Sequence, residues 1–180
     1  FGKLDFNVSM IGMGCASISG EGGGYGFGDI TEEESIALVH AAQDAGINLF
    51  DTAPIYGFGM SEVRLGKALK GERRERAFVV SKSGITWDDQ KAVRLDNSPK
   101  TTRAMLEQSL KDLQTDYLDI YYLHLPDYDT PIEESLAAID ELKREGKIRY
   151  PATSNYSAWQ MVKSLWIADR LGLDPIRSIQ

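Results

Sequence analysis

The stretch YLDIYYLHLPDYDTPIEESLAAIDELKREGKIRY, residues 117–150, contains an apolar run, a helical pattern and the start of a second apolar run. The first run, Leu118 to Leu123, is nearly unbroken, as expected of a strand buried on both faces. Between Ile132 and Leu142, apolar residues recur at helical spacing. Because strands joined through a helix usually lie parallel in one sheet, this stretch predicts a β-α-β unit.

The alternation of strand and helix signals extends along the whole chain. The strand candidates are Val8 to Gly12, Ile47 to Asp51, Phe78 to Ser81, Leu118 to Leu123, Ile148 to Thr153 and Ile176 to Gln180. Helices are predicted near residues 32–45, 61–70, 99–113, 131–145 and 158–171, and GERRER at 71–76 is predicted as a solvated turn. This pattern is typical of an α/β fold with parallel strands.

Local signals refine the boundaries of these elements. Three helix starts fit the capping box, in which a hydroxyl and a side chain three residues later satisfy backbone donors reciprocally: Thr31 with Glu34, Thr130 with Glu133, and Ser157 with Gln160. Pro151 lies inside the fifth strand candidate and has no backbone donor. We therefore expect that strand to end early, which leaves the placement of the residues after it open.

Composition limits the class of protein. With 180 residues, 42% of them apolar and 26% charged, the chain is predicted to form one globular domain over residues 1–180. A net charge of -7 argues against nucleic-acid binding, and no apolar stretch is long enough to predict a membrane span. Cys15 is the single cysteine, so we expect no disulfide or cysteine metal site and favour the cytoplasm; its own predicted role is a small buried residue.

Two architectures fit repeated β-α units: an open doubly wound sheet and a closed barrel. The segment GMGCASISG, residues 12–20, lacks the glycine spacing that the first turn of a dinucleotide-binding sheet usually carries. This absence favours the barrel. The glycine-rich segment at 20–29 has no phosphate-binding pattern and is predicted as a loop over a site.

Four polar residues follow or end the predicted strands: Asp51, Tyr56, Lys82 and His124. In a barrel of parallel strands, the carboxyl ends of the strands form the face on which catalysis takes place. A lysine in an apolar strand is rare unless it is paired, whereas His124 alone also fits a core histidine. His40 lies within a helix and is predicted to be structural.

Together these groups suit the reduction of a carbonyl. Negative charge builds on the oxygen as hydride reaches the carbon, and a proton must meet it. A tyrosine can supply that proton if a nearby ammonium lowers its pKa, which is the role that Lys82 fits, with Asp51 pairing to the lysine. His124 is placed to orient a substrate oxygen.

The segments that carry these residues resemble the aldo-keto reductase family. The resemblance rests on FDTAPIYGFGMSEVRLGKAL (50–69), VVSKSG (79–84), residues 117–150 and TSNYSAWQ (153–160), and extends from about Val8 to Gln180. It implies a (β/α)8 barrel that reduces aldehydes and ketones with NADPH, less often with NADH. It also implies a small-molecule carbonyl substrate, and it leaves oligomerisation open.

By that resemblance Tyr56 is the general acid, Lys82 lowers its pKa, Asp51 pairs with Lys82, and His124 orients the substrate. The resemblance further assigns cofactor contacts to Asp51, Ser154, Asn155 and Gln180; without it, Ser154 and Asn155 suggest a plain turn before a helix. Trp87 and Phe58 are candidates for the wall of the substrate pocket. The family resemblance assigns no metal ligand.

The length of the chain qualifies this interpretation. A (β/α)8 barrel typically takes ~250 residues, so we expect the 180 residues to supply about six of its eight strands. Two other functions stay open: a cofactor-binding regulatory subunit of the same fold, as in potassium-channel β subunits, and an inactive fragment. The sequence identifies neither the substrate nor the preferred nucleotide.

Overall fold

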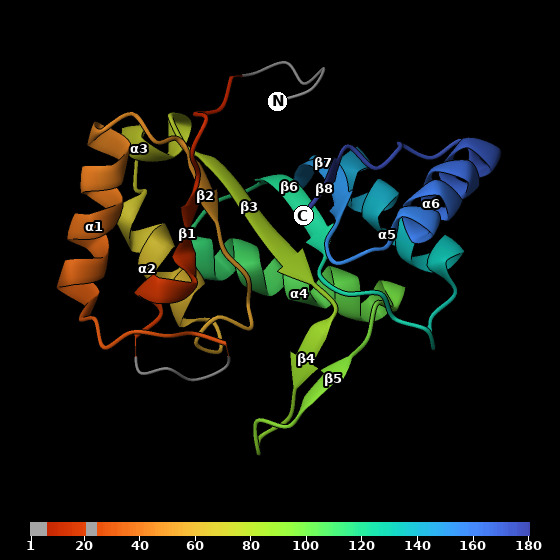
Figure 1. The fold of residues 1–180 in the computed structure, drawn as a ribbon, viewed down its shortest axis with the longest axis horizontal. Helices are drawn as coiled ribbons and strands as arrows, with labels where there is room; N and C mark the ends of the chain where they lie inside the picture. Colours follow the sequence, from red (N-terminus) through yellow and green to blue (C-terminus); the bar gives the residue numbers. More distant parts are fainter. Residues whose placement is uncertain (1–6, 21–24) are drawn as a thin grey trace. The chain divides into compact units, whose positions relative to one another are not determined.

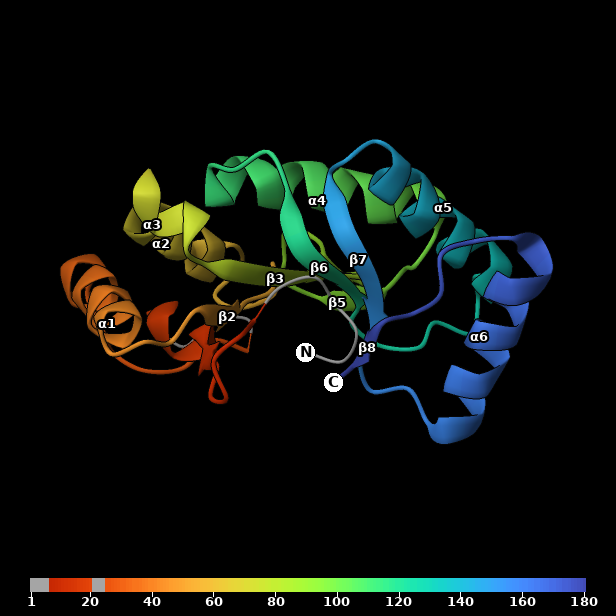
Figure 2. The ribbon, with the colours of Figure 1, turned by 90° about the horizontal axis from the view of Figure 1, so that it is seen from above.

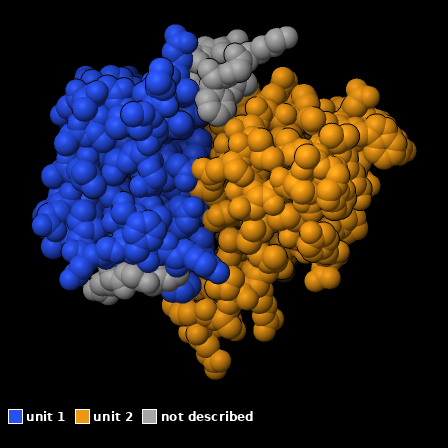
Figure 3. Space-filling model, viewed as in Figure 1, with its two compact units in different colours: residues 1–80, 111–115 blue, residues 81–110, 116–180 orange. Residues whose placement is uncertain are grey.

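The structure, a computed structural model, describes residues 7–20 and 25–180. Parallel strands alternate with helices along the chain (Figure 1). Two compact units are present: unit 1 comprises Phe1–Val80 and Lys111–Thr115, and unit 2 comprises Ser81–Leu110 and Asp116–Gln180 (Figure 3). The prediction of one domain over residues 1–180 stays a prediction.

Unit 1 contains three parallel strand segments and the helices between them. Its elements are β1 (Met13–Gly14), the short helix η1 (Cys15–Ile18), α1 (Glu32–Asp44), β2 (Leu49–Asp51), α2 (Met60–Ala68), α3 (Glu72–Glu75) and the first half of β3 (Phe78–Ser83). β2 lies between β1 and β3, with Phe50 opposite Met13 on one side and Val79 on the other. Phe50 is fully buried, as the apolar pattern predicted.

The first predicted strand, Val8 to Gly12, is wrong in position. β1 is Met13–Gly14, whereas Met10 is fully exposed. The Ser9 amide donates to Asn48 Oδ1 at 2.7 Å, and the Asn48 amide donates to Ser9 Oγ at 3.1 Å. Side-chain hydrogen bonds therefore replace the backbone ladder along this apolar run. The predicted loop at 20–29 includes residues 21–24, which lie outside the described residues.

Helices α1 and α2 pack together in unit 1. The Nε2 atom of His40, in α1, lies 2.8 Å from the Ala68 carbonyl oxygen, in α2. Lys67 of α2 also forms a 2.8 Å ion pair with Glu32 of α1. His40 thus takes part in helix packing, as expected. The Cys15 side chain is fully buried, also as expected. The segment predicted as a solvated turn at 71–76 contains the four-residue helix α3, in which no residue is buried.

Unit 2 continues the parallel order. Its elements are the end of β3, β4 (Ile85–Trp87), β5 (Val93–Leu95), most of α4 (Pro99–Leu113), β6 (Leu118–Leu123), α5 (Ile132–Arg144), β7 (Ile148–Thr153), α6 (Ala158–Leu171) and β8 (Ser178–Ile179). The strand order is β3-β6-β7-β8, and α5 packs against both β7 and α6 (Figure 2). β6 is buried along all six residues, as expected of a central parallel strand.

The sequence did not predict the hairpin of β4 and β5. These strands pair antiparallel, with Ile85 opposite Leu95, and the turn is held by Asp88 Oδ1, which accepts from the amides of Gln90 and Ala92. All three residues of β5 are exposed. The second strand, Val93-Arg94-Leu95, does alternate apolar and polar residues, but three residues are too few for alternation to predict a strand.

Pro151 does not shorten the fifth strand, so that expectation is wrong. β7 runs through Pro151 to Thr153, and Pro151 lies opposite Tyr121 of β6. The Pro151 carbonyl accepts from the Arg177 amide at 2.9 Å, so this residue faces β8. In a parallel strand, the N–H and C=O groups of one residue point to the same neighbouring strand. The backbone N–H that proline lacks would therefore also face β8. The pairing of β8 with β7 starts only at Ser178. The proline therefore removes no rung of the ladder.

Two of the three predicted capping boxes are confirmed. Thr31 with Glu34 and Ser157 with Gln160 form both reciprocal hydrogen bonds. The third is wrong, because the residue preceding α5 is Pro131 and the helix has no side-chain cap. Thr130 Oγ1 instead donates to Asp127 Oδ2 at 2.7 Å.

Candidate active site

The turn after β2 positions two of the predicted site residues in unit 1. Asp51 is the last residue of β2, and Tyr56 lies in the turn before α2, where its amide donates to Ala53 at 3.1 Å. Positive φ angles at Gly57, Phe58 and Gly59 (66°, 52° and 96°) close this turn. Such angles are uncommon for a residue with a side chain, so Phe58 lies in a constrained position.

Buried hydroxyls anchor the same turn to the short helix η1. Thr52 Oγ1 and Ser61 Oγ are 2.8 Å apart, and Ser61 Oγ donates to the Cys15 carbonyl at 2.7 Å. Both side chains are fully buried. Because the hydrogen bonds join the end of β2, the start of α2 and η1, the backbone around Tyr56 is held at both ends.

Lys82 lies within β3, which extends two residues beyond its predicted end. Its exposed fraction is 1%, and the neighbouring Ser81 and Ser83 are also buried. A lysine is rarely buried without a compensating partner, because removing an ammonium from water is costly. The sequence signal, a lysine in an apolar strand, identified this unusual position correctly.

His124 follows β6 in unit 2, next to the end of β3. Its amide donates to the Ser83 carbonyl at 3.0 Å, and Ser83 Oγ donates to the Tyr122 carbonyl at 3.4 Å. Burial, and then the Lys82 ammonium, lower the pKa of His124 to about 3. The imidazole is therefore neutral at physiological pH and has one donor and one acceptor nitrogen.

Ser154 and Asn155 follow β7 and form a hydrogen-bonded group with His124. The Ser154 amide donates to the Leu123 carbonyl at 2.8 Å, and Asn155 Nδ2 donates to the His124 carbonyl and to Ser154 Oγ, both at 2.9 Å. Gln180 joins this group after β8, since its carbonyl accepts from the Asn155 amide at 2.9 Å. The ends of β6, β7 and β8 are thus connected through the predicted cofactor residues.

The residues at this end of unit 2 fit a carboxamide. Asn155 has φ of 60°, a conformation that asparagine tolerates better than most residues, and its side chain is exposed. Its Oδ1 accepts no hydrogen bond within the part of the chain that the structure describes. An amide group of a ligand, which carries both a donor and an acceptor, can use that oxygen together with the Gln180 side chain.

The structure places the remaining candidate in the hairpin after Lys82. Trp87 ends β4 and is partly exposed. Unit 1 therefore holds Asp51, Tyr56 and Phe58, and unit 2 holds the other predicted site residues. Ser83, which links β3 to β6 beside His124, was missed by the sequence analysis, although its position directly after Lys82 in an apolar run could have indicated it.

A family model described as the aldo/keto reductase family matches residues 10–179. The chain belongs to this family. Its members include an aldo-keto reductase of Bacillus subtilis (strain 168), YhdN, to which this aldo/keto reductase chain is 42% identical over 155 residues, or 86% of the chain and 45% of the relative. A relative named NADH-specific methylglyoxal reductase, from Escherichia coli (strain K12), is 39% identical over 87% of the chain and 51% of its own length.

Solved structures of the family share the fold. The glycerol dehydrogenase AKR11B4 from Gluconobacter oxydans matches with a TM-score of 0.85 at 35% identity, over 99% of this chain and 53% of that one. The aldo-keto reductase AKR11C1 from Bacillus halodurans, in a holo form, matches with a TM-score of 0.80 at 33% identity, over 99% and 54%. The chain is therefore part of a (β/α)8 barrel, as predicted.

The aldo/keto reductase chain spans about half the length of the curated relatives it matches. Within the described residues, no helix has the length and hydrophobicity needed to cross a membrane. The same residues contain no group of three or more His, Cys, Asp or Glu side chains arranged to hold a metal ion.

Proposed function

We propose that the protein reduces an aldehyde or ketone to an alcohol with hydride from NADPH, and that Tyr56 donates the proton. Membership of the aldo/keto reductase family makes it an oxidoreductase. The proposed carbonyl reduction rests mainly on a neutral His124 beside the buried Lys82. Both lie at strand ends, where the Asn155 side chain donates a hydrogen bond to the His124 carbonyl. These are the groups that a carbonyl oxygen gaining charge requires.

Each residue of the tetrad has a proposed role. A nicotinamide, when bound, would supply hydride to the carbonyl carbon. Neutral His124 donates a hydrogen bond to the carbonyl oxygen and orients it, and Tyr56 transfers its phenolic proton to that oxygen. The Lys82 ammonium stabilises the phenolate that remains, and Asp51 pairs with Lys82.

Ser154, Asn155 and Gln180 are proposed to hold the nicotinamide carboxamide, with Asp51 as a further cofactor contact. Support comes from the hydrogen bonds that connect the first three residues. NADPH is the proposed nucleotide, and NADH is the alternative to measure, since one relative is named an NADH-specific reductase. Trp87 and Phe58 are proposed to line the substrate pocket of a small carbonyl compound, and the cytoplasm is the proposed location.

Substitution of Tyr56 by Phe tests the proton donor. In the whole protein we expect Tyr56→Phe to lower kcat for NADPH-dependent aldehyde reduction by roughly 100-fold or more, the usual contribution of a positioned general acid. NADPH affinity, measured by fluorescence titration, should stay within about twofold, because no cofactor contact is proposed for Tyr56.

Tyr117→Phe provides the matched control, because Tyr117 precedes β6 and lies at the amino end of that strand. It should retain the parental rate. A Tyr56→Phe enzyme that still oxidised NADPH at the original aldehyde-dependent rate would disprove the assignment. If the parent protein bound NADPH but turned over no aliphatic or aromatic aldehyde, a regulatory role would replace the proposed catalytic one.

A further inference from the structure

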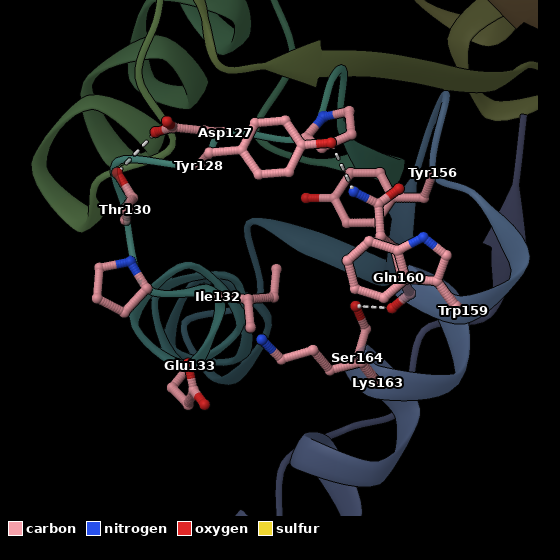
Figure 4. Close-up of a pocket in the computed structure, with 12 residues that line it drawn as sticks. Asp127, Tyr128, Thr130, Ile132, Glu133, Tyr156, Trp159, Gln160, Lys163 and Ser164 are labelled. Carbon is pink, nitrogen blue, oxygen red and sulfur yellow. Dashed lines mark hydrogen bonds between the residues drawn. The ribbon is translucent and has the colours of Figure 1, made fainter.

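Unit 2 contains a cavity of about 320 Å³ whose lining includes none of the residues assigned to catalysis. It lies between the segment after β6 and the first turns of α5 and α6, and the rings of Tyr128, Tyr156 and Trp159 line it with Ile132 and Lys163 (Figure 4). This volume is within the range of small-molecule pockets. None of these five residues has a role in the proposed reduction.

Two aromatic side chains form exposed walls of the pocket. Tyr128 is 81% exposed and Trp159 is 63% exposed. Gln160 Nε2 donates to the Tyr128 hydroxyl at 3.2 Å, and Gln160 Oε1 in turn accepts from Ser157, so the Tyr128 ring is held in place (Figure 4). Large exposed aromatic surfaces beside a cavity favour stacking with a planar ligand.

The hydroxyl of a largely buried tyrosine faces the same cavity. Tyr156 is only 8% exposed and lines the pocket, yet its hydroxyl forms no hydrogen bond with any of the described residues. Burial, and then the Asp127 carboxylate and Tyr128, raise the pKa of Tyr156. The phenol therefore stays protonated, and its proton is available to a ligand acceptor.

Positive charge and backbone donors are added from both helices. The Lys163 ammonium of α6 has no hydrogen-bond or ion-pair partner among residues 7–20 and 25–180, and it extends toward Ile132 (Figure 4). The 13-residue helix α5 begins here without a side-chain cap. Its first amide groups thus contribute further donors and the positive end of the helix dipole.

The two acidic residues of the lining do not cancel these groups. Asp127 is occupied, because its Oδ2 accepts from the Asn97 amide and from Thr130 Oγ1, and its Oδ1 accepts from the Asp129 amide. Glu133 is exposed and points away from the aromatic rings (Figure 4). The Lys163 ammonium and the Tyr156 hydroxyl, both donors, therefore line the cavity without a partner among the described residues.

We propose that this pocket binds a small planar aromatic carboxylate, with its ring against Tyr128 and Trp159 and its carboxylate at Lys163 and the Tyr156 hydroxyl. A cationic or neutral ring compound lacks the acceptor that these donors require. None of the residues that line the pocket belongs to the tetrad, so an aromatic acid is expected to bind there without contacting the proposed catalytic side chains.

Isothermal titration calorimetry of the whole protein with benzoate tests this proposal. Benzoate should bind at least about tenfold more tightly than benzamide or benzylamine, because a charge-assisted hydrogen bond is lost with either. Lys163→Met should weaken benzoate binding about tenfold and Tyr156→Phe severalfold. Trp159→Ala, at an exposed position, should weaken benzoate and benzamide alike.

Two controls locate the binding. Lys100→Met, on the exposed part of α4, should leave benzoate affinity unchanged, and so should His124→Gln, which disturbs the candidate active site. Loss of binding in His124→Gln, equal affinities for benzoate and benzamide, or tighter binding of benzylamine would each overturn the proposal. An unchanged affinity in Lys163→Met and Trp159→Ala would do so as well.

Discussion

The position of His124 could be predicted from the sequence, but its charge state could not. A histidine at the end of an apolar run fits both a catalytic group and a buried core residue. The lowered pKa depends on burial and on Lys82, a residue about forty positions earlier that β3 brings next to β6. Only the fold supplies that neighbour, so no local pattern in the sequence could distinguish a neutral from a protonated imidazole.

The lowered pKa of His124 predicts that the protein loses stability in acid. Below pH 6.5 the unfolded chain protonates this histidine, whereas the folded protein keeps it neutral until about pH 3. The unfolded state then binds more protons, so the free energy of unfolding falls as the pH drops through this window. His124→Gln should remove this pH-dependent component of the free energy of unfolding, up to about 3 kcal/mol at pH 4.5, at ~1.4 kcal/mol for each pH unit below 6.5.

Urea unfolding of the parent and of His124→Gln at pH 7.5 and pH 4.5 measures the effect. Between pH 7 and pH 8 the two proteins should show parallel dependence on pH, because His124 is neutral in both states there. An equal loss of stability in both proteins at pH 4.5 would show that carboxylates, and not this imidazole, determine the acid sensitivity.

At the scale of elements, helix boundaries were predicted better than strands. α4 occupies the residues predicted for it, and the boxes before α1 and α6 are present, because a cap depends on residues within one turn. The third box failed because Thr130 has a competing partner, Asp127, that the box pattern does not consider. Positions of strands such as β1 depend on pairing with distant segments, which local apolarity does not specify.

The capping box of α1 gives a test of this local stability. Thr31 Oγ1 accepts from the Glu34 amide at 3.2 Å, and the Thr31 amide donates to Glu34 Oε2 at 2.9 Å. We expect Thr31→Ala to lower the free energy of unfolding by about 1 kcal/mol, as is usual for loss of an N-cap hydroxyl. Thr31→Ser keeps the hydroxyl and should retain most of the parental free energy of unfolding. Equal losses of this free energy in both variants, measured by urea titration, would exclude capping as the cause.

At the scale of the molecule, the repeated β-α pattern predicted the parallel order but not the division into two units. The residues of the proposed tetrad are divided between these units, Asp51 and Tyr56 in one, Lys82 and His124 in the other. Two elements belong to both: β3 pairs with β2 through Phe78–Val80 and continues into unit 2, and α4 ends with residues 111–113 in unit 1. Neither unit keeps its full set of elements when the other unfolds.

Shared elements predict that the two units unfold together. All three tryptophans, Trp87, Trp159 and Trp166, lie in unit 2, so their fluorescence reports on that unit, whereas far-UV circular dichroism reports on the helices of both. We expect coincident urea transitions by the two probes. Leu38→Trp, at a 45% exposed position of α1, adds a fluorescence signal from unit 1 and should not move the midpoint. If the added signal changed at a urea concentration different from that of the original tryptophans, β3 and α4 would not couple the units, and each would have its own free energy of unfolding.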